Sequence, residues 1–300
     1  MIIKEKKMPK AKGNNIEIEY ETFGDPSAKP LLLVNGLGGQ MIGWDVEFIQ
    51  LFVDRGFYVI RFDNRDVGLS TKFEDAGEPN LIQAFVAVQK GEPVESPYSI
   101  EDMADDAIGL LDALNIEKAH ICGVSMGGMI VQVITIRHPS RVLSLTSIMS
   151  TTGDRSLPQP TQETVQALFK PIPPERDVYI ENYIRVGKIL YGSGFPYNEQ
   201  KGRKLAGRLF DRCFYPHGLG RQMLAIMANG NRKSKLSSVK VPTLIIHGNN
   251  DPLVLIDGGK DTHNAIPGSE LIIIDGMGHS LPPETWTQVT DAIKANAAKA

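Results

Sequence analysis

The sequence predicts an α/β fold in which a mainly parallel, doubly wound sheet carries an inserted helical segment. Three observations lead to this prediction. In both terminal parts of the 300-residue chain, short apolar runs alternate with helical patterns, as in a parallel sheet covered by helices on both faces. Between residues 153 and 238 this alternation stops, and helical patterns follow one another without strands. A hydrophobic content of 42% suffices for one large core and a smaller insert.

The strands follow from apolar runs of four to eight residues. Residues 16–23 alternate Ile16, Ile18 and Tyr20 with glutamates, which predicts an antiparallel edge strand. The runs that predict the other strands are 31–34, 58–62, 120–123, 142–149, 243–247 and 271–274.

Two helices are predicted from clear sequence patterns. Residues 100–114 carry apolar side chains at helical spacing, and Ser99 with Asp102 forms a capping-box pattern that starts this helix. Residues 126–136 are apolar almost all round, which predicts a central helix buried within the fold.

A candidate nucleophile lies between a strand and a helix. The pentapeptide Gly123-Val124-Ser125-Met126-Gly127 joins the apolar run 119–122 to the buried helix. In a nucleophile elbow, a sharp turn lifts the serine hydroxyl above the sheet, and a Cβ at either flanking glycine would collide with a neighbouring element. Ser125 is therefore the candidate attacking group, and the alternative is a small residue in a tight glycine-rich turn.

A serine hydroxyl needs an imidazole to take its proton and a buried acid to orient that imidazole. In elbow-type hydrolases the chain order is serine, acid, histidine. His279 follows the strand run 271–274, and Asp251 follows the run 243–247, so both should reach the same sheet edge as Ser125. Asp154 is the substitute acid, and His263 also follows an acid in the required order.

The developing oxyanion needs two N–H donors. One is expected from the backbone of Met126, directly after the nucleophile, and the other from the glycine-rich loop that follows the run 31–34, at Leu37. A dinucleotide-binding loop is the rival interpretation of this segment. It is weak, because the third glycine position after Gly36 and Gly38 holds Met41.

Five segments in this order resemble the α/β-hydrolase family: 35–39, 63–70, 123–127, 247–251 and 278–279. Within that family the chain is most similar to the serine carboxylesterases that include aclacinomycin methylesterase, through its Asp-Asn-Arg-Asp turn and Gly-x-Ser-Met-Gly-Gly elbow. It departs from the usual pattern at Asn35, where many members carry histidine. The resemblance implies an α/β-hydrolase fold and an acyl-enzyme mechanism for carboxylic ester hydrolysis that needs no cofactor.

We interpret residues 153–238 as a helical cap inserted between core strands 6 and 7, with the core formed by 1–152 and 239–300. The cap is rich in aromatic residues, so Tyr183 and Phe214, together with Gly36 and Gly38, are predicted to line a substrate pocket. The alternative is that the rings simply pack cap helices onto the core. Basic residues in the cap outnumber acidic ones by two to one, which favours either an anionic substrate or a solvated surface.

Other functions share these motifs. Carbon–carbon bond hydrolases, enol-lactonases and perhydrolases use the same triad, because a fold does not fix a function. A hydrolase-fold ligand receptor is an alternative of another class, in which slow turnover is coupled to binding of a partner protein. Dehalogenases and epoxide hydrolases are disfavoured, since those branches place aspartate where this chain has Ser125.

Composition limits the remaining possibilities. The formal net charge is −3 and the isoelectric point about 6.1, which gives no support for nucleic-acid binding. No apolar run has the length of a membrane span and the N-terminus lacks a secretory pattern, so a cytoplasmic location is the default prediction.

Two cysteines, Cys122 and Cys213, predict neither a disulfide nor a thiol nucleophile, and no metal-site spacing is present. The expected partner is a small-molecule ester, and a homodimer is a possible assembly.

Overall fold

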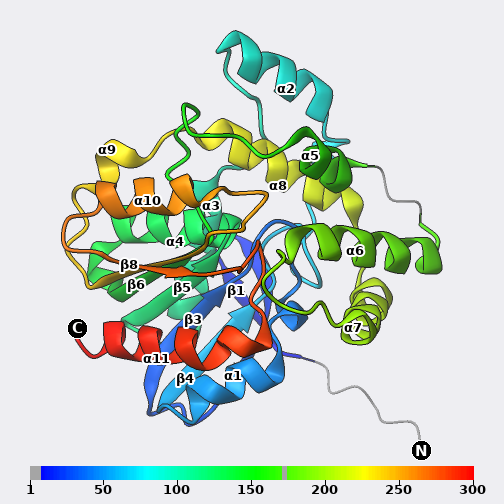
Figure 1. The fold of residues 1–300 in the computed structure, drawn as a ribbon. Coiled ribbons are helices and arrows are strands. Elements are labelled where there is room, and N and C mark those ends of the chain that lie inside the picture. The colour runs from blue at the N-terminus through cyan, green and yellow to red at the C-terminus, as the bar shows by residue number, and fades with distance from the viewer. Residues whose placement is uncertain (1–7, 171–173) are drawn as a thin grey trace, which may run out of the picture.

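The computed structural model describes residues 8–170 and 174–300, and its centre is a single twisted sheet (Figure 1). The strand order is β1-β2-β4-β3-β5-β6-β7-β8. Pairing is antiparallel between β1, β2 and β4 and parallel from β4 onwards, as predicted for a mainly parallel sheet. The strands are β1 (Lys10–Gly13), β2 (Ile16–Phe23), β3 (Lys29–Val34), β4 (Phe57–Phe62), β5 (Ala119–Val124), β6 (Val142–Ile148), β7 (Thr243–Gly248) and β8 (Glu270–Ile274).

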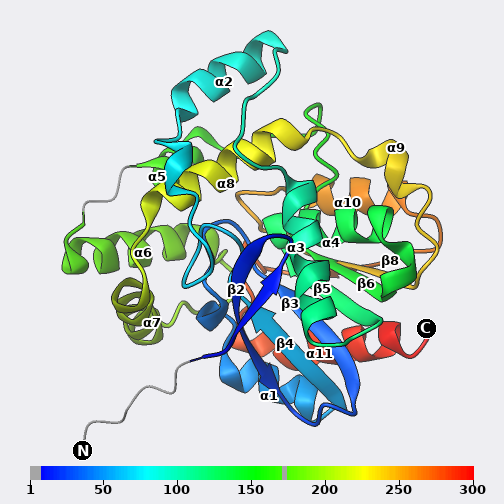
Figure 2. The same cartoon turned by 180° about the vertical axis from the view of Figure 1, so that it is seen from behind.

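Helices cover both faces of the sheet, with α1 and α11 on one side and α3, α4 and α10 on the other (Figures 1 and 2). The capping box of Ser99 and Asp102 starts α3 as predicted, and α4 is buried nearly all round. None of the helices in the described ranges is long and apolar enough to cross a membrane. The helices are α1 (Val46–Val53), α2 (Leu81–Lys90), α3 (Ile100–Ala113), α4 (Met126–Arg137), α5 (Gln162–Phe169), α6 (Arg176–Leu190), α7 (Glu199–Arg212), α8 (Pro216–Asn229), α9 (Lys233–Leu236), α10 (Ile256–Ala265) and α11 (Trp286–Ala297).

The core divides into two apolar layers because successive side chains of a strand point to opposite faces. In β3, Leu32 and Val34 pack with α3 and α4, whereas Leu31 and Leu33 pack with α1 and α11. All four side chains are completely buried. This explains why the run 31–34 shows no polar alternation in the sequence.

The edge of the sheet differs from the prediction. The strand β2 has the predicted bounds but pairs with β4 on one side and with β1 on the other, so β1 is the edge strand. A turn at Asn14 and Asn15, both with positive φ, joins β1 to β2. The strand β1 has no signal in the sequence, because a four-residue strand with two lysines has no apolar pattern.

The helices α5 to α9 follow one another between β6 and β7. Two of them, α6 and α7, pair beyond the carboxyl ends of the strands, and α8 lies against α2 (Figures 1 and 2). Residues 153–238 are the proposed cap. The core helix α2 also contacts this group, so the layer above the sheet edge is built from two separate parts of the sequence.

The register and order of the strands show where the candidate site lies. Val34 pairs with Gly123, so the loop after β3 begins beside the turn after β5. The strands β6, β7 and β8 lie next to β5 in that order. Since parallel strands end at one edge, the segments after β3, β5, β7 and β8 all emerge beneath the inserted helices.

Candidate active site

Ser125 occupies a strained turn between β5 and α4. Its backbone φ is +55°, a conformation that non-glycine residues rarely adopt, and its N–H donates to the carbonyl oxygen of Ile148 at 2.9 Å. A Cβ at Gly123 would lie 2.1 Å from the carbonyl oxygen of Gly127, and a Cβ at Gly127 would lie 2.2 Å from that of Val34. Neither glycine can therefore be replaced without moving the backbone, as a nucleophile elbow requires.

The three residues predicted from strand ends lie in one hydrogen-bonded chain. His279 Nε2 is 2.9 Å from Ser125 Oγ, and His279 Nδ1 is 2.7 Å from Asp251 Oδ2. With Nδ1–H donating to the carboxylate, Nε2 is free to accept the proton of the serine hydroxyl. The backbone N–H of His279 also donates to the carbonyl oxygen of Leu190 in α6, which ties the histidine loop to the inserted helices.

The acid is held ionised and fixed in position. Asp251 Oδ1 accepts the backbone N–H groups of Leu253 and Val254, each at 2.9 Å. Burial acts to raise the pKa of Asp251, but the charge of His279 and hydrogen bonds from His247 and His279 outweigh it, so the pKa lies well below its usual value. The carboxylate therefore stays charged across the physiological pH range.

The two alternative residues lie elsewhere. Asp154 accepts hydrogen bonds from Ser156 and faces a different cavity. His263 contacts Ser269 Oγ through Nδ1 at 2.9 Å, in the segment that leads into β8. His247, at the end of β7, contacts the carbonyl oxygen of Val254 at 2.7 Å and supports the loop that carries Asp251.

The two expected oxyanion donors flank the serine. Met126 is the first residue of α4, so its N–H has no acceptor within the helix. Leu37 lies in a turn closed by the Gly39 N–H and the Gly36 carbonyl at 3.1 Å, and it lines the pocket. Over the described ranges, neither Leu37 nor Met126 donates its N–H to a protein acceptor. By contrast, the N–H of Gly38 donates to Gln222 Oε1 at 2.8 Å.

Asn35 holds this loop through two hydrogen bonds. Its Nδ2 donates to the carbonyl oxygen of Gln40 at 2.8 Å, and its own carbonyl oxygen accepts from Asn64 Nδ2 at 3.1 Å. The asparagine thus joins the two ends of the glycine-rich loop and connects them to the turn after β4.

A cavity of about 400 Å³ opens above Ser125 and His279. Of the two glycines predicted for the pocket, Gly36 lies in the lining of this cavity and Gly38 does not. Tyr183 and Phe214 do not reach it either, because both pack around Tyr179 between α6 and α7. The sequence alone does not distinguish aromatic rings that pack between inserted helices from rings that line a pocket. The larger side chains that line the cavity are Trp44, Phe48, Met149, Leu168, Leu190, Leu219, Met223, Leu253, Leu281 and Trp286.

No lysine or arginine is among the described residues that line the cavity. Its one acidic side chain, Asp45, pairs with Lys201 Nζ at 2.6 Å. Most basic residues of the inserted segment are in ion pairs or exposed to solvent, as in the pair of Arg203 with Glu181. Arg232 is buried and donates hydrogen bonds to Gln132 Oε1 and to the carbonyl oxygen of Thr151, outside this cavity. The site therefore provides an apolar surface around a polar catalytic centre.

The cysteines lie outside the triad. Burial raises the pKa of Cys122 to about 12, so this thiol stays protonated and cannot act as a nucleophile. Cys122 and Cys213 are both free thiols. Over the described ranges, no group of three His, Cys, Asp or Glu side chains could hold a metal ion.

The fold, the elbow and the order of the triad residues are those of an α/β hydrolase. The family model for the alpha/beta hydrolase fold matches residues 29–284, and the chain belongs to this family. Among curated relatives, it is 27% identical to rhodomycin D methylesterase of Streptomyces peucetius over 94% of this chain and 95% of that protein.

Other relatives have different activities. The chain is 25% identical to a 2-hydroxy-6-oxononadienedioate/2-hydroxy-6-oxononatrienedioate hydrolase of Paraburkholderia phymatum, over 95% of this chain and 90% of that protein. Its fold is similar to that of the enol-lactonase of Burkholderia xenovorans, with a TM-score of 0.73 and 21% identity over 97% of this chain and 100% of that one.

Proposed function

We propose that this protein is a serine hydrolase that cleaves carboxylic esters, with Ser125 as nucleophile, His279 as general base and acid, and Asp251 as the residue that orients the histidine. The observation that carries this proposal is the hydrogen-bonded chain from Ser125 Oγ through His279 to Asp251, at the base of a cavity of about 400 Å³. The similarity over nearly the whole chain to a methylesterase supports the same activity.

In the first half of the reaction, His279 Nε2 takes the proton of Ser125 as Oγ attacks the ester carbonyl carbon. The carbonyl oxygen becomes an oxyanion, which accepts the backbone N–H groups of Leu37 and Met126. Protonated His279 then gives its proton to the alkoxy oxygen, the carbon–oxygen bond breaks, and the alcohol leaves. Ser125 is left as the acyl ester.

In the second half, His279 takes a proton from water as the water oxygen attacks the acyl carbon. The same two N–H groups hold the second oxyanion. When the tetrahedral intermediate collapses, His279 returns the proton to Ser125 Oγ and the carboxylic acid is released. Asp251 stays ionised throughout and stabilises the imidazolium that forms in each half.

The pocket favours an uncharged ester over the dicarboxylate substrate of the carbon–carbon hydrolase alternative. The name of the Paraburkholderia relative specifies a dicarboxylate substrate. A buried substrate carboxylate needs a cationic partner, and the described lining of this cavity offers none. An apolar acyl or alkoxy group, in contrast, matches the leucines, methionines and tryptophans that line it.

Hydrolysis of p-nitrophenyl esters from acetate to palmitate tests the proposal. Wild type should turn over these esters and be inactivated by a fluorophosphonate, whereas Ser125→Ala should lose at least about 1000-fold in kcat and resist labelling. Thermal unfolding of Ser125→Ala checks that the fold is retained. Wild-type activity in a folded Ser125→Ala variant would disprove the assignment of the nucleophile.

A ligand receptor would give a different result. It would be labelled at Ser125 yet turn over every ester very slowly, and labelling or ligand binding would change its affinity for a partner protein. The cytoplasmic location, the homodimer and the cap boundaries remain predictions from the sequence.

A further inference from the structure

A glutamine of the inserted segment bonds to the loop that carries one expected oxyanion donor. Gln222 lies in α8 and is completely buried. Its Oε1 accepts the backbone N–H of Gly38 at 2.8 Å, and its Nε2 donates to the carbonyl oxygen of Arg65 at 2.8 Å. Only one orientation of the amide satisfies both partners, since Gly38 offers a donor and Arg65 an acceptor.

The bond to Gly38 fixes the peptide next to Leu37. The turn from Gly36 to Gly39 has Gly38 at φ +66°, which is the sign that a type II turn requires at its third residue. In such a turn the central peptide, between Leu37 and Gly38, can rotate to an alternative orientation. That peptide carries the Leu37 carbonyl and the Gly38 N–H, and it adjoins the peptide that carries the Leu37 N–H. With Gln222 Oε1 accepting the Gly38 N–H, rotation or displacement of the turn would leave the buried amide oxygen of Gln222 without a donor, so the bond holds the turn that contains the Leu37 N–H in place.

The other side of the loop is also held. A Cβ on Gly38 would lie 2.8 Å from Leu219 Cδ1, so α8 already touches the turn one helical turn before Gln222. Gln40 Nε2 donates to the carbonyl oxygens of Leu209 and Cys213, at the end of α7. The loop after β3 is thus held between the sheet and two helices of the inserted segment.

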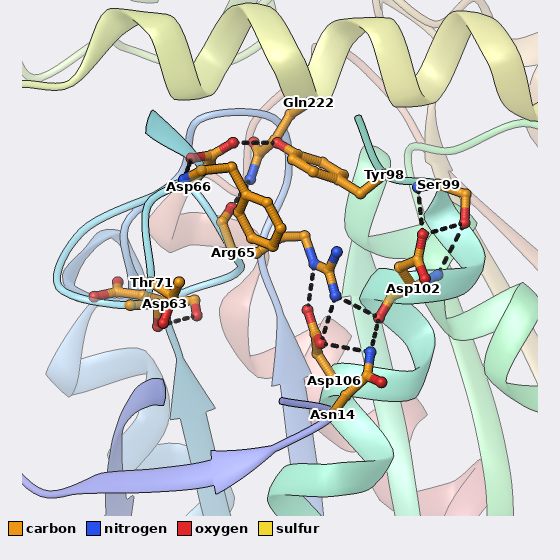
Figure 3. A network of polar contacts seen from close by, with 12 residues as sticks. Asn14, Asp63, Arg65, Asp66, Thr71, Tyr98, Ser99, Asp102, Asp106 and Gln222 are labelled. Carbon is orange, nitrogen blue, oxygen red and sulfur yellow. Dashed lines mark hydrogen bonds and ion pairs between the residues drawn. The ribbon is translucent and has the colours of Figure 1, made fainter. Parts of the chain in front are cut away.

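Figure 3 shows that the anchor of Gln222 belongs to a network of polar contacts. The carbonyl of Arg65 belongs to the turn after β4, and the Arg65 guanidinium makes a paired hydrogen bond with Asp106, at 2.6 and 2.7 Å. In the same turn, Asp66 accepts from Tyr98 (Figure 3) and from Arg221 of α8. Gln222 therefore bridges two core segments, one held by these polar contacts and one rich in glycine.

We propose that Gln222 is a positioning residue that sets the Leu37 N–H for stabilisation of the oxyanion. It touches neither substrate nor Ser125 and acts only through Gly38. This inference rests on the proposed ester hydrolysis and extends it, because it makes the efficiency of the oxyanion hole depend on where α8 lies. Any movement of α8 away from the sheet edge would weaken transition-state stabilisation before it changed the triad.

The test compares Gln222→Met with Gln132→Met. Gln132 is an equally buried helical glutamine that bonds Ser147 Oγ and Arg232 Nε, away from the cavity. Both variants lose two side-chain hydrogen bonds at nearly constant volume. In Gln222→Met, kcat should fall at least about tenfold with KM within threefold of wild type, because the loss concerns the transition state. Gln132→Met should keep wild-type kcat.

A second readout separates this inference from the proposed function. The rate at which a fluorophosphonate labels Ser125 also depends on the oxyanion hole, since the adduct is tetrahedral. That rate should fall in parallel with kcat, even if the natural substrate is not an ester. If Gln222→Met does not fold, Gln222→Asn, whose shorter side chain cannot span both partners, replaces it with the same criteria. Wild-type kcat and labelling rate in a folded variant would overturn the inference.

Discussion

At the scale of single residues, hydrogen bonds fix the buried carboxylate of the candidate triad. Asp251 accepts two backbone N–H groups on one oxygen and His279 on the other. This arrangement leaves the carboxylate no alternative orientation. It also explains why the acid can be buried in its charged form, since each oxygen has hydrogen-bond donors.

Replacing Asp251 by asparagine should impair catalysis and leave the fold intact. The amide keeps the size of the side chain, but it cannot stabilise the imidazolium and allows the wrong tautomer of His279. We expect kcat to fall by about 1000-fold or more. Ester hydrolysis and thermal unfolding measure the two effects. A loss below tenfold in a folded variant would mean that another acid orients His279.

His120 gives a pH dependence of stability that is independent of catalysis. The ring is buried in β5, and its Nδ1 lies 2.8 Å from Ser144 Oγ. Burial, aided by the charge of Lys29, lowers the pKa of His120 to about 4. Because the folded pKa lies below the unfolded value of 6.5, the contribution to stability is complete above pH 6.5 and is lost as the pH falls towards 4.

Urea unfolding at pH 7.5 and pH 5 tests this linkage. Wild type should lose about 1 kcal/mol more than His120→Gln between these two values, after discounting the shift for partial solvent screening. The glutamine cannot titrate, so it removes this source of pH dependence. Equal losses in the two proteins would show that His120 is not protonated on unfolding.

At the scale of secondary-structure elements, buried ion pairs join the inserted helices to the turn after β4. Arg221 of α8 contacts Asp66 at 2.8 Å, and Arg212 of α7 contacts Asp63 at 2.7 Å. Both aspartates are completely buried. The segment 63–70, which carries part of the family resemblance, therefore has a structural role as the attachment point of α7 and α8.

Arg221→Met should destabilise the protein strongly, because it leaves Asp66 buried without its cationic partner. We expect a loss of about 3 kcal/mol in the free energy of unfolding. Arg176→Met is the matched control, since Arg176 pairs with Asp211 at the surface and its loss should change stability little. Comparable unfolding midpoints for the two variants would contradict the proposed role of Arg221.

At the scale of the whole molecule, the cavity lies between the carboxyl edge of the sheet and the helical layer above it. Its walls come from segments as distant as Asn35 and Trp286. The basic residues of the inserted segment are not among the described residues that line the cavity, so they make no direct contact with a substrate bound there. We expect substrate selectivity to depend on the side chains that line the cavity rather than on the net charge of the inserted segment.

Two p-nitrophenyl esters of the same chain length measure this selectivity. The hexanoate should be hydrolysed with a kcat/KM at least about tenfold higher than the adipate monoester, whose free carboxylate would be buried without a cation. Activity measured at two salt concentrations controls for long-range charge effects, which salt screens. A preference for the adipate monoester would favour the lactonase or carbon–carbon hydrolase alternatives.

The order of elements, the elbow, and the positions of Ser125, Asp251 and His279 could be predicted from the sequence. Strand ends and tight turns depend on residues that are adjacent in the chain, and glycines and apolar runs mark them directly. The strand β1 could not be predicted, because its pairing with β2 rather than its own composition makes it a strand.

Only the tertiary structure decided which side chains surround the reaction. Tyr183 and Phe214 have the composition expected of a pocket, yet they pack around Tyr179. Gln222 resembles any polar helical residue in the sequence and becomes distinctive only through its contacts with Gly38 and Arg65, which lie more than 150 residues away. The physical reason is that local patterns specify backbone conformation, whereas the direction of a helical side chain depends on how the helix packs.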